Sequence, residues 1–125
     1  MSETVVEKRS LGRDQFREKK PRRTIVVEIP ELDGQVIVQA MTARERGEYE
    51  AQFITPKGEI RKLASRTREL LAIASCVDSE GVKIFTTADM EWLGDVDAKI
   101  LERITKAAQE LSDISDKDLD DLAKN

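Results

Sequence analysis

The alternation of apolar and polar positions over residues 24–41 predicts a β-hairpin. The apolar residues that recur at every second position are Ile25, Val27 and Ile29 before the turn and Val36, Val38 and Ala40 after it. Between them, Asp33 and Gly34 tolerate the positive φ of a tight turn, and Pro30 lacks an amide donor, which marks the strand's end or an edge position. Because an isolated hairpin is marginal in water, this one must pack on helices or pair with another chain.

Two later segments repeat apolar residues with the 3.6-residue period of an amphipathic helix. The first is residues 59–77, where the basic side chains fall largely outside the apolar stripe, as on a solvated helix face. The second begins after Asp95 or Asp97, either of which can cap it, and keeps its apolar stripe to Ile114. One pair of these stripes can close the core of the domain.

Capping signals predict three shorter helices. The first begins at the capping box Thr42–Glu45 and ends near Phe53. The second follows Thr86–Asp89 and ends at Gly94, and the third follows Ser115–Asp118. The sequence therefore predicts an α+β, mainly α fold, with an N-terminal β-hairpin followed by about four to five helices in a small bundle.

The segment from Leu70 to Gly94 holds a helix end, a turn, a short extended piece and a capped helix. Gly81 supplies the positive φ of the turn. Phe85 and Trp92, two of the chain's few aromatic residues, fall on its apolar positions. Nothing in this segment suits chemistry on a substrate, so it favours a protein that works by packing against other proteins.

The amino-acid composition excludes several classes of enzyme and metal site. The chain has 125 residues, typical of one domain, and it has no histidine, which excludes Ser-His and Cys-His triads and the commonest metal ligand. Its one cysteine, Cys76, lies in an apolar run and is expected to be buried. The phosphate-binding glycine loops are absent, and the acidic tail lacks the Gly and Glu of a calcium loop. We expect no enzyme, no cofactor and no metal site.

Charge and hydropathy bear on location and partners. The chain has no run of eighteen apolar residues and begins with charged residues, so we expect no membrane span and a cytoplasmic location. Residues 1–23 carry eight basic and four acidic side chains, and we interpret them as a flexible basic arm. The cluster Lys19, Lys20, Arg22 and Arg23 could touch phosphates, but the chain is acidic overall and stacking aromatics are few.

The order of motifs between Leu70 and Gly94 resembles the tail assembly chaperones of long-tailed phages. The motifs are Asp78-x-x-Gly81, an apolar residue followed by Phe85, Thr86-x-x-Asp89 and Leu93-Gly94. The resemblance extends to the Asp33-Gly34 turn, to Met41–Glu45 and to the long helix that ends at Leu111-Ser112. It covers roughly residues 24–125, which predicts a single tail-assembly-chaperone-like domain, and leaves the arm 1–23 outside.

The resemblance implies a function without catalytic residues. Members bind the tape-measure protein, keep it soluble while the tail tube assembles, and are missing from the mature virion. It therefore implies work in the host cell cytoplasm, with the tape-measure protein, the tail tube protein and further copies of the chain as partners. Members often have a longer frameshifted product, and the A-rich codons that Lys124-Asn125 can use fit a slippery site.

Candidate protein-binding residues are the apolar side chains that the core does not obviously need, or that lie on the hairpin edge. They are Met90, Trp92, Leu93, Phe85, Ile25 and Val27. For Phe85 and Trp92 the alternative is an ordinary role in the core. Two alternative functions stay open from the sequence: a head–tail connector or adaptor that remains in the particle, and a small nucleic-acid-binding regulator that uses the basic arm.

Overall fold

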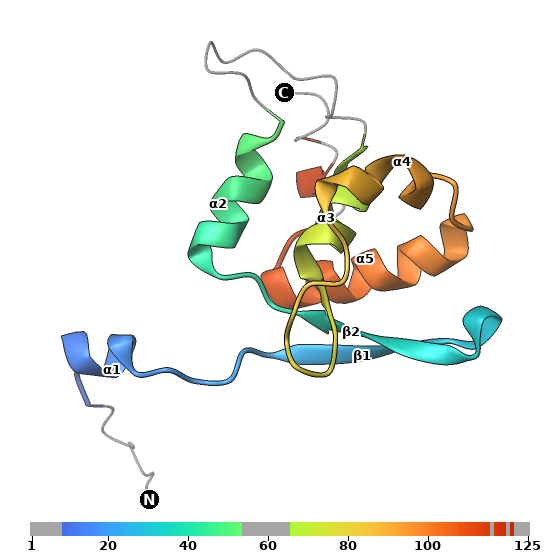
Figure 1. Cartoon of the computed structure of the whole chain (residues 1–125). Coiled ribbons are helices and arrows are strands. Elements are labelled where there is room, and N and C mark those ends of the chain that lie inside the picture. Colours follow the sequence, from blue (N-terminus) through green and yellow to red (C-terminus); the bar gives the residue numbers. More distant parts are fainter. Residues whose placement is uncertain (1–8, 54–65, 116, 120, 122–125) are drawn as a thin grey trace, which may run out of the picture.

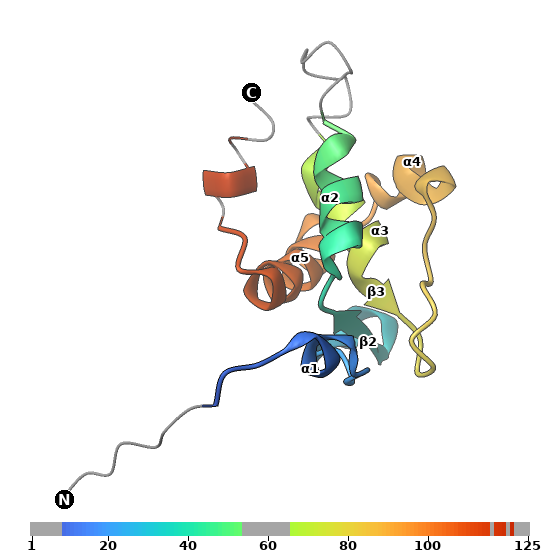
Figure 2. The same ribbon diagram turned by 90° about the vertical axis from the view of Figure 1, so that its left-hand side faces the viewer.

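The β-hairpin is followed by helices that all lie on one side of it (Figures 1 and 2). The computed structural model describes residues 9–53, 66–115, 117–119 and 121. The elements of this part are α1 (Arg13–Arg17), β1 (Thr24–Ile29), η1 (Pro30–Leu32), β2 (Gly34–Gln39), α2 (Ala43–Ala51), α3 (Thr67–Ser75), β3 (Cys76–Val77), η3 (Thr87–Asp89), α4 (Met90–Leu93) and α5 (Ala98–Ser112). The predicted α+β, mainly α class is confirmed.

The predicted hairpin is present, with its turn at Asp33. Strands β1 and β2 pair antiparallel from Thr24↔Gln39 to Ile29↔Gly34. Strand β1 ends before Pro30, which is the first residue of η1, one turn of 3₁₀ helix. Asp33 follows it in the left-handed conformation, with a φ of 54°. The positive φ therefore falls on Asp33, which belongs with asparagine to the non-glycine residue types that adopt it most readily.

A third strand corrects one prediction. The helical stripe predicted helix up to residue 77, but α3 ends at Ser75, and Cys76–Val77 form β3, which pairs antiparallel with β2. In the strand order β1-β2-β3, this pairing supplies hydrogen-bond partners for backbone groups of the middle strand, β2. These hydrogen bonds replace those that two further residues of helix would have made. Residues 59–65 of the predicted helix lie outside the described part of the chain.

The core lies between the sheet and the helices, where α5 packs on β1, β2 and α3. The stripe predicted for α5 is confirmed, because its buried residues are Ile100, Leu101, Ile104, Thr105, Ala107, Ala108 and Leu111. Helix α3 is buried on more than one face, since Leu70, Leu71, Ala72 and Ile73 are all buried. It is therefore the central helix of the domain.

Two aromatic residues, Tyr49 in α2 and Phe53 just after it, are buried on the side of α2 that packs against α3. The rings of Tyr49 and Phe53 meet edge to face with centroids 5.1 Å apart, and both side chains are buried. The Tyr49 hydroxyl donates a 3.1 Å hydrogen bond to the Thr67 carbonyl at the start of α3. The predicted capping box of α2 is present, with Thr42 and Glu45 exchanging hydrogen bonds of 2.9 and 3.1 Å.

The C-terminal end of α5 is held by the start of the hairpin and by α2. Arg23 donates to the Leu111 carbonyl at 2.6 Å, and Arg46 donates to the Ser112 carbonyl at 2.9 Å. Cations at this end also complement the helix dipole. After Asp113 the chain turns, and the predicted exchange between Ser115 and Asp118 starts the last helical turn, whose Leu119 is buried.

The basic arm contains one short helix that the sequence pattern did not predict. Helix α1 has no buried residue, and Gln15 caps its start by accepting a 2.8 Å hydrogen bond from the Gly12 amide. The flexibility expected of residues 1–23 stays a prediction, and residues 1–8 lie outside the described part. Within the described residues, no helix combines the length and the apolar character needed to span a bilayer.

Candidate protein-binding groove

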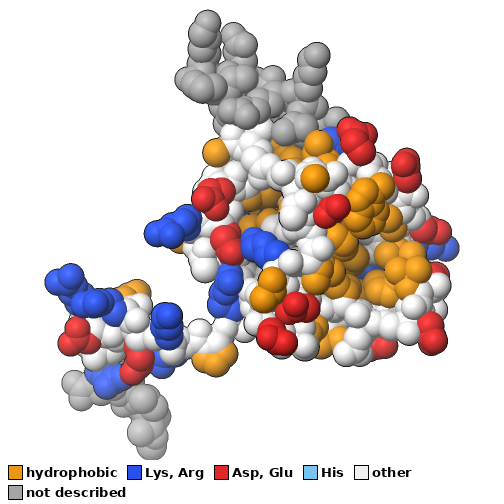
Figure 3. Space-filling view, viewed as in Figure 1, with side chains coloured by type: hydrophobic (Ala, Val, Ile, Leu, Met, Phe, Trp, Pro, Cys, Tyr) orange, Lys and Arg blue, Asp and Glu red, His pale blue; other side chains and the backbone are white. Residues whose placement is uncertain are grey.

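An apolar groove of about 370 Å³ lies between the hairpin tip, the chain before α4, and α5. Figure 3 shows hydrophobic side chains gathered on this face, below α4 and toward the hairpin tip. The residues that line the groove are Ile29, Leu32, Gly34, Gln35, Val36, Ile84, Phe85, Trp92, Leu93, Val96, Ile100, Leu101 and Ile104. Its floor belongs to the core, whereas Leu32, Ile84 and Trp92 at its mouth are exposed, so apolar surface is available to a partner.

Trp92 is held in place at the mouth of the groove. Its indole Nε1 donates a 3.0 Å hydrogen bond to Asp89, and its ring meets that of Phe85 edge to face with centroids 5.8 Å apart. Asp89 also accepts a 2.8 Å hydrogen bond from the Thr86 amide, and these donors hold the pKa of the Asp89 carboxyl below its usual value. A capping residue therefore fixes the orientation of the tryptophan.

The predicted site residues separate into two groups. Phe85, Trp92 and Leu93 line the groove, with Trp92 49% exposed, Phe85 partly buried and Leu93 buried. Met90 is partly buried, and its carbonyl accepts a hydrogen bond from Arg66.

The hairpin residues lie elsewhere. Ile25 is partly buried and packed against the core, and Val27 is buried in it. Their side chains are therefore engaged by the core. The backbone of β1 forms the outer edge of the sheet, because β1 is the first strand in the described order β1-β2-β3 and pairs with β2 on one side.

Most of the groove lining was not among the predicted site residues, and Leu32, Val36 and Ile84 are three examples that come from outside α4 and α5. Leu32 is 71% exposed in the hairpin turn, Val36 follows the turn, and Ile84 lies some fifty residues later. A leucine inside the predicted turn was the one local signal available. Nothing local indicates that these residues meet, because the folding of the segment 82–86 against the sheet brings them together.

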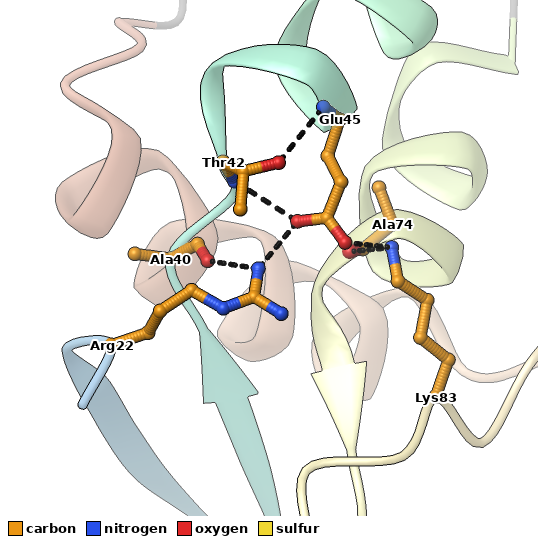
Figure 4. A network of polar contacts seen from close by, with 6 residues as sticks. All are labelled: Arg22, Ala40, Thr42, Glu45, Ala74 and Lys83. Carbon is orange, nitrogen blue, oxygen red and sulfur yellow. Dashed lines mark hydrogen bonds and ion pairs between the residues drawn. The ribbon is translucent and has the colours of Figure 1, made fainter. Parts of the chain in front are cut away.

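A polar network fixes the segment that carries Ile84 and Phe85. Lys83 Nζ donates to the Ala74 carbonyl at 2.8 Å and lies 3.2 Å from a Glu45 carboxylate oxygen (Figure 4). The other oxygen of Glu45 accepts from the Thr42 amide and from Arg22, which also donates to the Ala40 carbonyl. Glu45 therefore joins α2, the start of the hairpin and the groove segment.

The charge environment of Glu45 keeps it ionised. Burial by itself would raise the pKa of the Glu45 carboxyl, but the Thr42 amide, the Arg22 guanidinium and the Lys83 ammonium together lower it below its usual value. These three partners favour the anion, and the anion in turn holds Lys83 beside the groove.

A second ion pair joins the hairpin tip to α5 at the side of the groove. Both guanidinium nitrogens of Arg103 donate to Glu31, at 2.7 and 2.6 Å. This bidentate contact lowers the pKa of the Glu31 carboxyl to about 2. The pair holds η1 against α5 and so fixes the position of Leu32.

The groove is bordered by acidic residues on the α4 side. Glu91, Asp95 and Asp97 are exposed and lie beside the groove residues Trp92 and Val96 in the sequence. A neighbouring hollow of about 460 Å³ shares Trp92 with the groove and is lined also by Arg66, Glu69, Glu91, Gly94 and Asp95. An apolar partner with basic residues at its margin would therefore fit this face.

Metal binding and thiol reactivity can both be judged from the described residues. Among them, no group of three or more His, Cys, Asp or Glu side chains could hold a metal ion. Cys76 is buried as predicted, and burial raises the pKa of its thiol to about 12, so the unreactive protonated form dominates.

Comparison with solved structures finds a likeness at the level of the fold. No protein-family model matches the chain, and a search of curated proteins finds no match. The solved structure of the bacteriophage HK97 tail assembly chaperone is similar over 82% of this chain and 95% of that chain, with a TM-score of 0.54 and 20% sequence identity. This likeness shows that the chain has the fold of a tail assembly chaperone, and it confirms the resemblance inferred from the motifs.

Proposed function

We propose that this chain is a phage tail assembly chaperone that binds the tape-measure protein and keeps it soluble while the tail tube assembles. The observation that carries the proposal is the fold shared with the HK97 tail assembly chaperone. The proposed role is non-catalytic, takes place in the host cell cytoplasm, and leaves the chain out of the mature virion. Contact with the tail tube protein and self-association belong to the same proposal.

The groove supports this role through its size and composition. An amphipathic helix of the client would lay apolar residues spaced three and four apart against Leu32, Ile84 and Trp92. Burial of each large apolar side chain contributes roughly 1.5–3 kcal/mol. The acidic residues beside α4 favour a client helix with basic residues on its flank.

The test measures binding of the tape-measure protein encoded by the same phage genome. The groove variant Leu32→Gln/Ile84→Gln changes two exposed residues at the mouth of the groove. Its matched control, Val26→Gln/Val82→Gln, changes two exposed residues that do not line it. We expect the groove variant to raise the Kd for the client at least tenfold, equivalent to about 1.4 kcal/mol, and the control to bind as the unmodified chain does.

Two outcomes would count against the proposal in different ways. If the unmodified chain leaves the client as insoluble as it is alone, the chaperone role is wrong. If both double variants bind equally well, the role stands and the client uses another surface, with the free edge of β1 as the next candidate.

Mass spectrometry of purified virions separates the chaperone from the head–tail connector alternative, because a chaperone should be absent from them.

The nucleic-acid alternative loses support from the arrangement of its basic cluster. Arg22 contacts Glu45 and the Ala40 carbonyl, and Arg23 contacts the Leu111 carbonyl, so both side chains are engaged by the domain.

A longer frameshifted product stays a prediction. Lys124 and Asn125 lie outside the described residues, and the messenger decides the question. We expect an A-rich slippery heptamer near these codons and an overlapping reading frame. A messenger without the heptamer would contradict the prediction.

A further inference from the structure

We propose that, before the client arrives, the groove of one copy is occupied by residues 9–20 of a second copy of this chain. This inference deepens the proposed function, because the arm and the client would then compete for the same surface. The arm has exposed apolar residues and a basic charge, and the groove has an apolar mouth and an acidic border.

The arm displays apolar residues that its own domain does not cover. Phe16 in α1 is 80% exposed and Leu11, just before α1, is 57% exposed. No residue of α1 is buried. A short helical turn with an exposed aromatic side chain is the kind of segment that anchors in an apolar groove, because one ring carries much of the buried area.

The charges of the two surfaces are opposite. Residues 9–20 contain five basic and two acidic side chains. On the α4 side, Glu69, Glu91 and Asp95 line the hollow beside Trp92 together with one cation, Arg66, which lies 3.8 Å from Glu91, so this side carries an excess of negative charge. Opposite charges at the margin of an apolar contact steer association and fix its orientation.

In the structure the arm does not occupy the groove of its own chain, since Phe16 and Leu11 are exposed and none of the described arm residues lines the groove. The base of the arm is fixed near the end of α5, because Arg22 donates to the Ala40 carbonyl at 3.2 Å and Arg23 to the Leu111 carbonyl at 2.6 Å. The groove begins where β1 ends, six strand residues away, or about 20 Å. Figure 1 shows α1 beyond one end of the hairpin and the turn at the other.

An arm at one end and a groove at the other give a head-to-tail contact. Such a contact uses two different patches, so each copy can bind one neighbour through its arm and another through its groove. The result is a chain or a ring of copies. A client helix that displaces an arm would open one such contact for each groove it fills.

The test uses the purified full-length chain without any client. Sedimentation velocity over a concentration series should show the unmodified chain growing beyond dimers. The arm variant Phe16→Gln changes an exposed residue and should fold normally, and the groove variant Leu32→Gln/Ile84→Gln removes the opposite partner. Each variant alone should associate at least tenfold more weakly.

Mixing the two variants is the decisive measurement. An equimolar mixture contains one intact groove, on the arm variant, and one intact arm, on the groove variant. We therefore expect association to return and to stop at a 1:1 dimer, because the second contact of that dimer lacks both partners. Raised salt should weaken this dimer, since its border contacts are exposed charges.

Several results would overturn the inference. The unmodified chain could remain monomeric at every concentration, or Phe16→Gln could associate as well as the unmodified chain. A mixture that stays monomeric while the unmodified chain oligomerises would mean that the arm does not use the groove of a neighbour. The control Val26→Gln/Val82→Gln should behave as the unmodified chain, and a loss of association there would implicate another surface.

This test and the client test can fail separately. If self-association through the arm is absent, client binding remains to be measured and can still succeed. If both are present, Phe16→Gln should bind the client at least as tightly as the unmodified chain, because the competing arm has lost its anchor.

Discussion

At the scale of single residues, Glu45 combines the role of a helix cap with that of a link between distant segments. Its capping contact with Thr42 is encoded three residues away, whereas its contacts with Arg22 and Lys83 form only when the hairpin and the groove segment fold onto α2. The sequence predicted the cap from local spacing. It could not predict the link, because the charged partners come from separate elements.

The first prediction concerns this link. Glu45→Gln keeps an oxygen that can accept the Thr42 amide but removes the charge that attracts Arg22 and Lys83. We expect the free energy of unfolding at pH 7 to fall by about 1–2 kcal/mol, measured by urea denaturation. The matched change Glu48→Gln, at an exposed position of the same helix, should shift it by less than about 0.5 kcal/mol. Equal effects of the two changes would refute a special role for Glu45.

The second prediction concerns the buried thiol. Because burial raises the pKa of Cys76 to about 12 and the side chain is fully covered, alkylating reagents should not label the folded chain at pH 8. Labelling should become complete in denaturing urea, as followed by intact-mass spectrometry. Rapid labelling under native conditions would mean that β3 opens easily from β2.

At the scale of elements, the sequence predicts what local chemistry determines and misses what tertiary pairing determines. The hairpin, its turn at Asp33 and the capped helices follow from spacing and from residue type. The strand at Cys76–Val77 does not follow from local sequence, because Val77 continues the apolar stripe of the helix. These two residues are extended because they pair with β2. Likewise Phe85 and Trp92 marked the groove segment, but the contribution of Leu32 depends on the tertiary fold.

The third prediction compares two glycines. A Cβ at Gly94 would lie 2.5 Å from Arg66 Nη2, which donates to the Met90 carbonyl and so joins the start of α3 to α4. Gly94→Ala should therefore displace this guanidinium and lower the free energy of unfolding by about 1 kcal/mol. Gly47→Ala, inside α2 with no atom near the new Cβ, should raise it by roughly 0.5–1 kcal/mol.

The comparison has an internal control. In an Arg66→Met background, Gly94→Ala should no longer be destabilising, because the group that the methyl displaces is gone. A cost that persists there would assign the effect to the Glu91 carbonyl oxygen, which would lie 3.3 Å from the new Cβ, since the φ of −64° at Gly94 is ordinary for alanine. The measurement is thermal unfolding of the unmodified chain, Gly94→Ala, Arg66→Met and the double variant, which together form a double-mutant cycle.

At the scale of the whole molecule, the shifted groups predict a plateau of stability between acid and alkaline limits. The carboxyl groups whose pKa is lowered in the folded chain are Glu31, Glu45, Asp89 and Asp118. Their stabilisation is present above their ordinary pKa values of 4.5 and 3.8 and is lost as the pH falls through the lowered values, to about 2 for Glu31.

The alkaline limit has the opposite sign. Burial raises the pKa values of Tyr49 and Cys76, so their stabilisation is present below the ordinary values of 10.0 and 9.0 and declines as the pH rises beyond them. We expect the midpoint of urea unfolding to be nearly constant between about pH 5 and pH 9 and to fall on both sides. In Glu31→Gln the fall between pH 4.5 and 2 should be shallower. An unchanged acid limb would contradict the role of the Glu31–Arg103 pair.

The position of Trp92 has a practical consequence. It is the one tryptophan of the sequence and it lies half exposed at the mouth of the groove. Its emission spectrum is therefore an intrinsic optical reporter of that single location. Whatever covers the indole should move the emission toward shorter wavelengths. The occupancy of the groove can thus be followed in an unlabelled, unmodified chain and in real time.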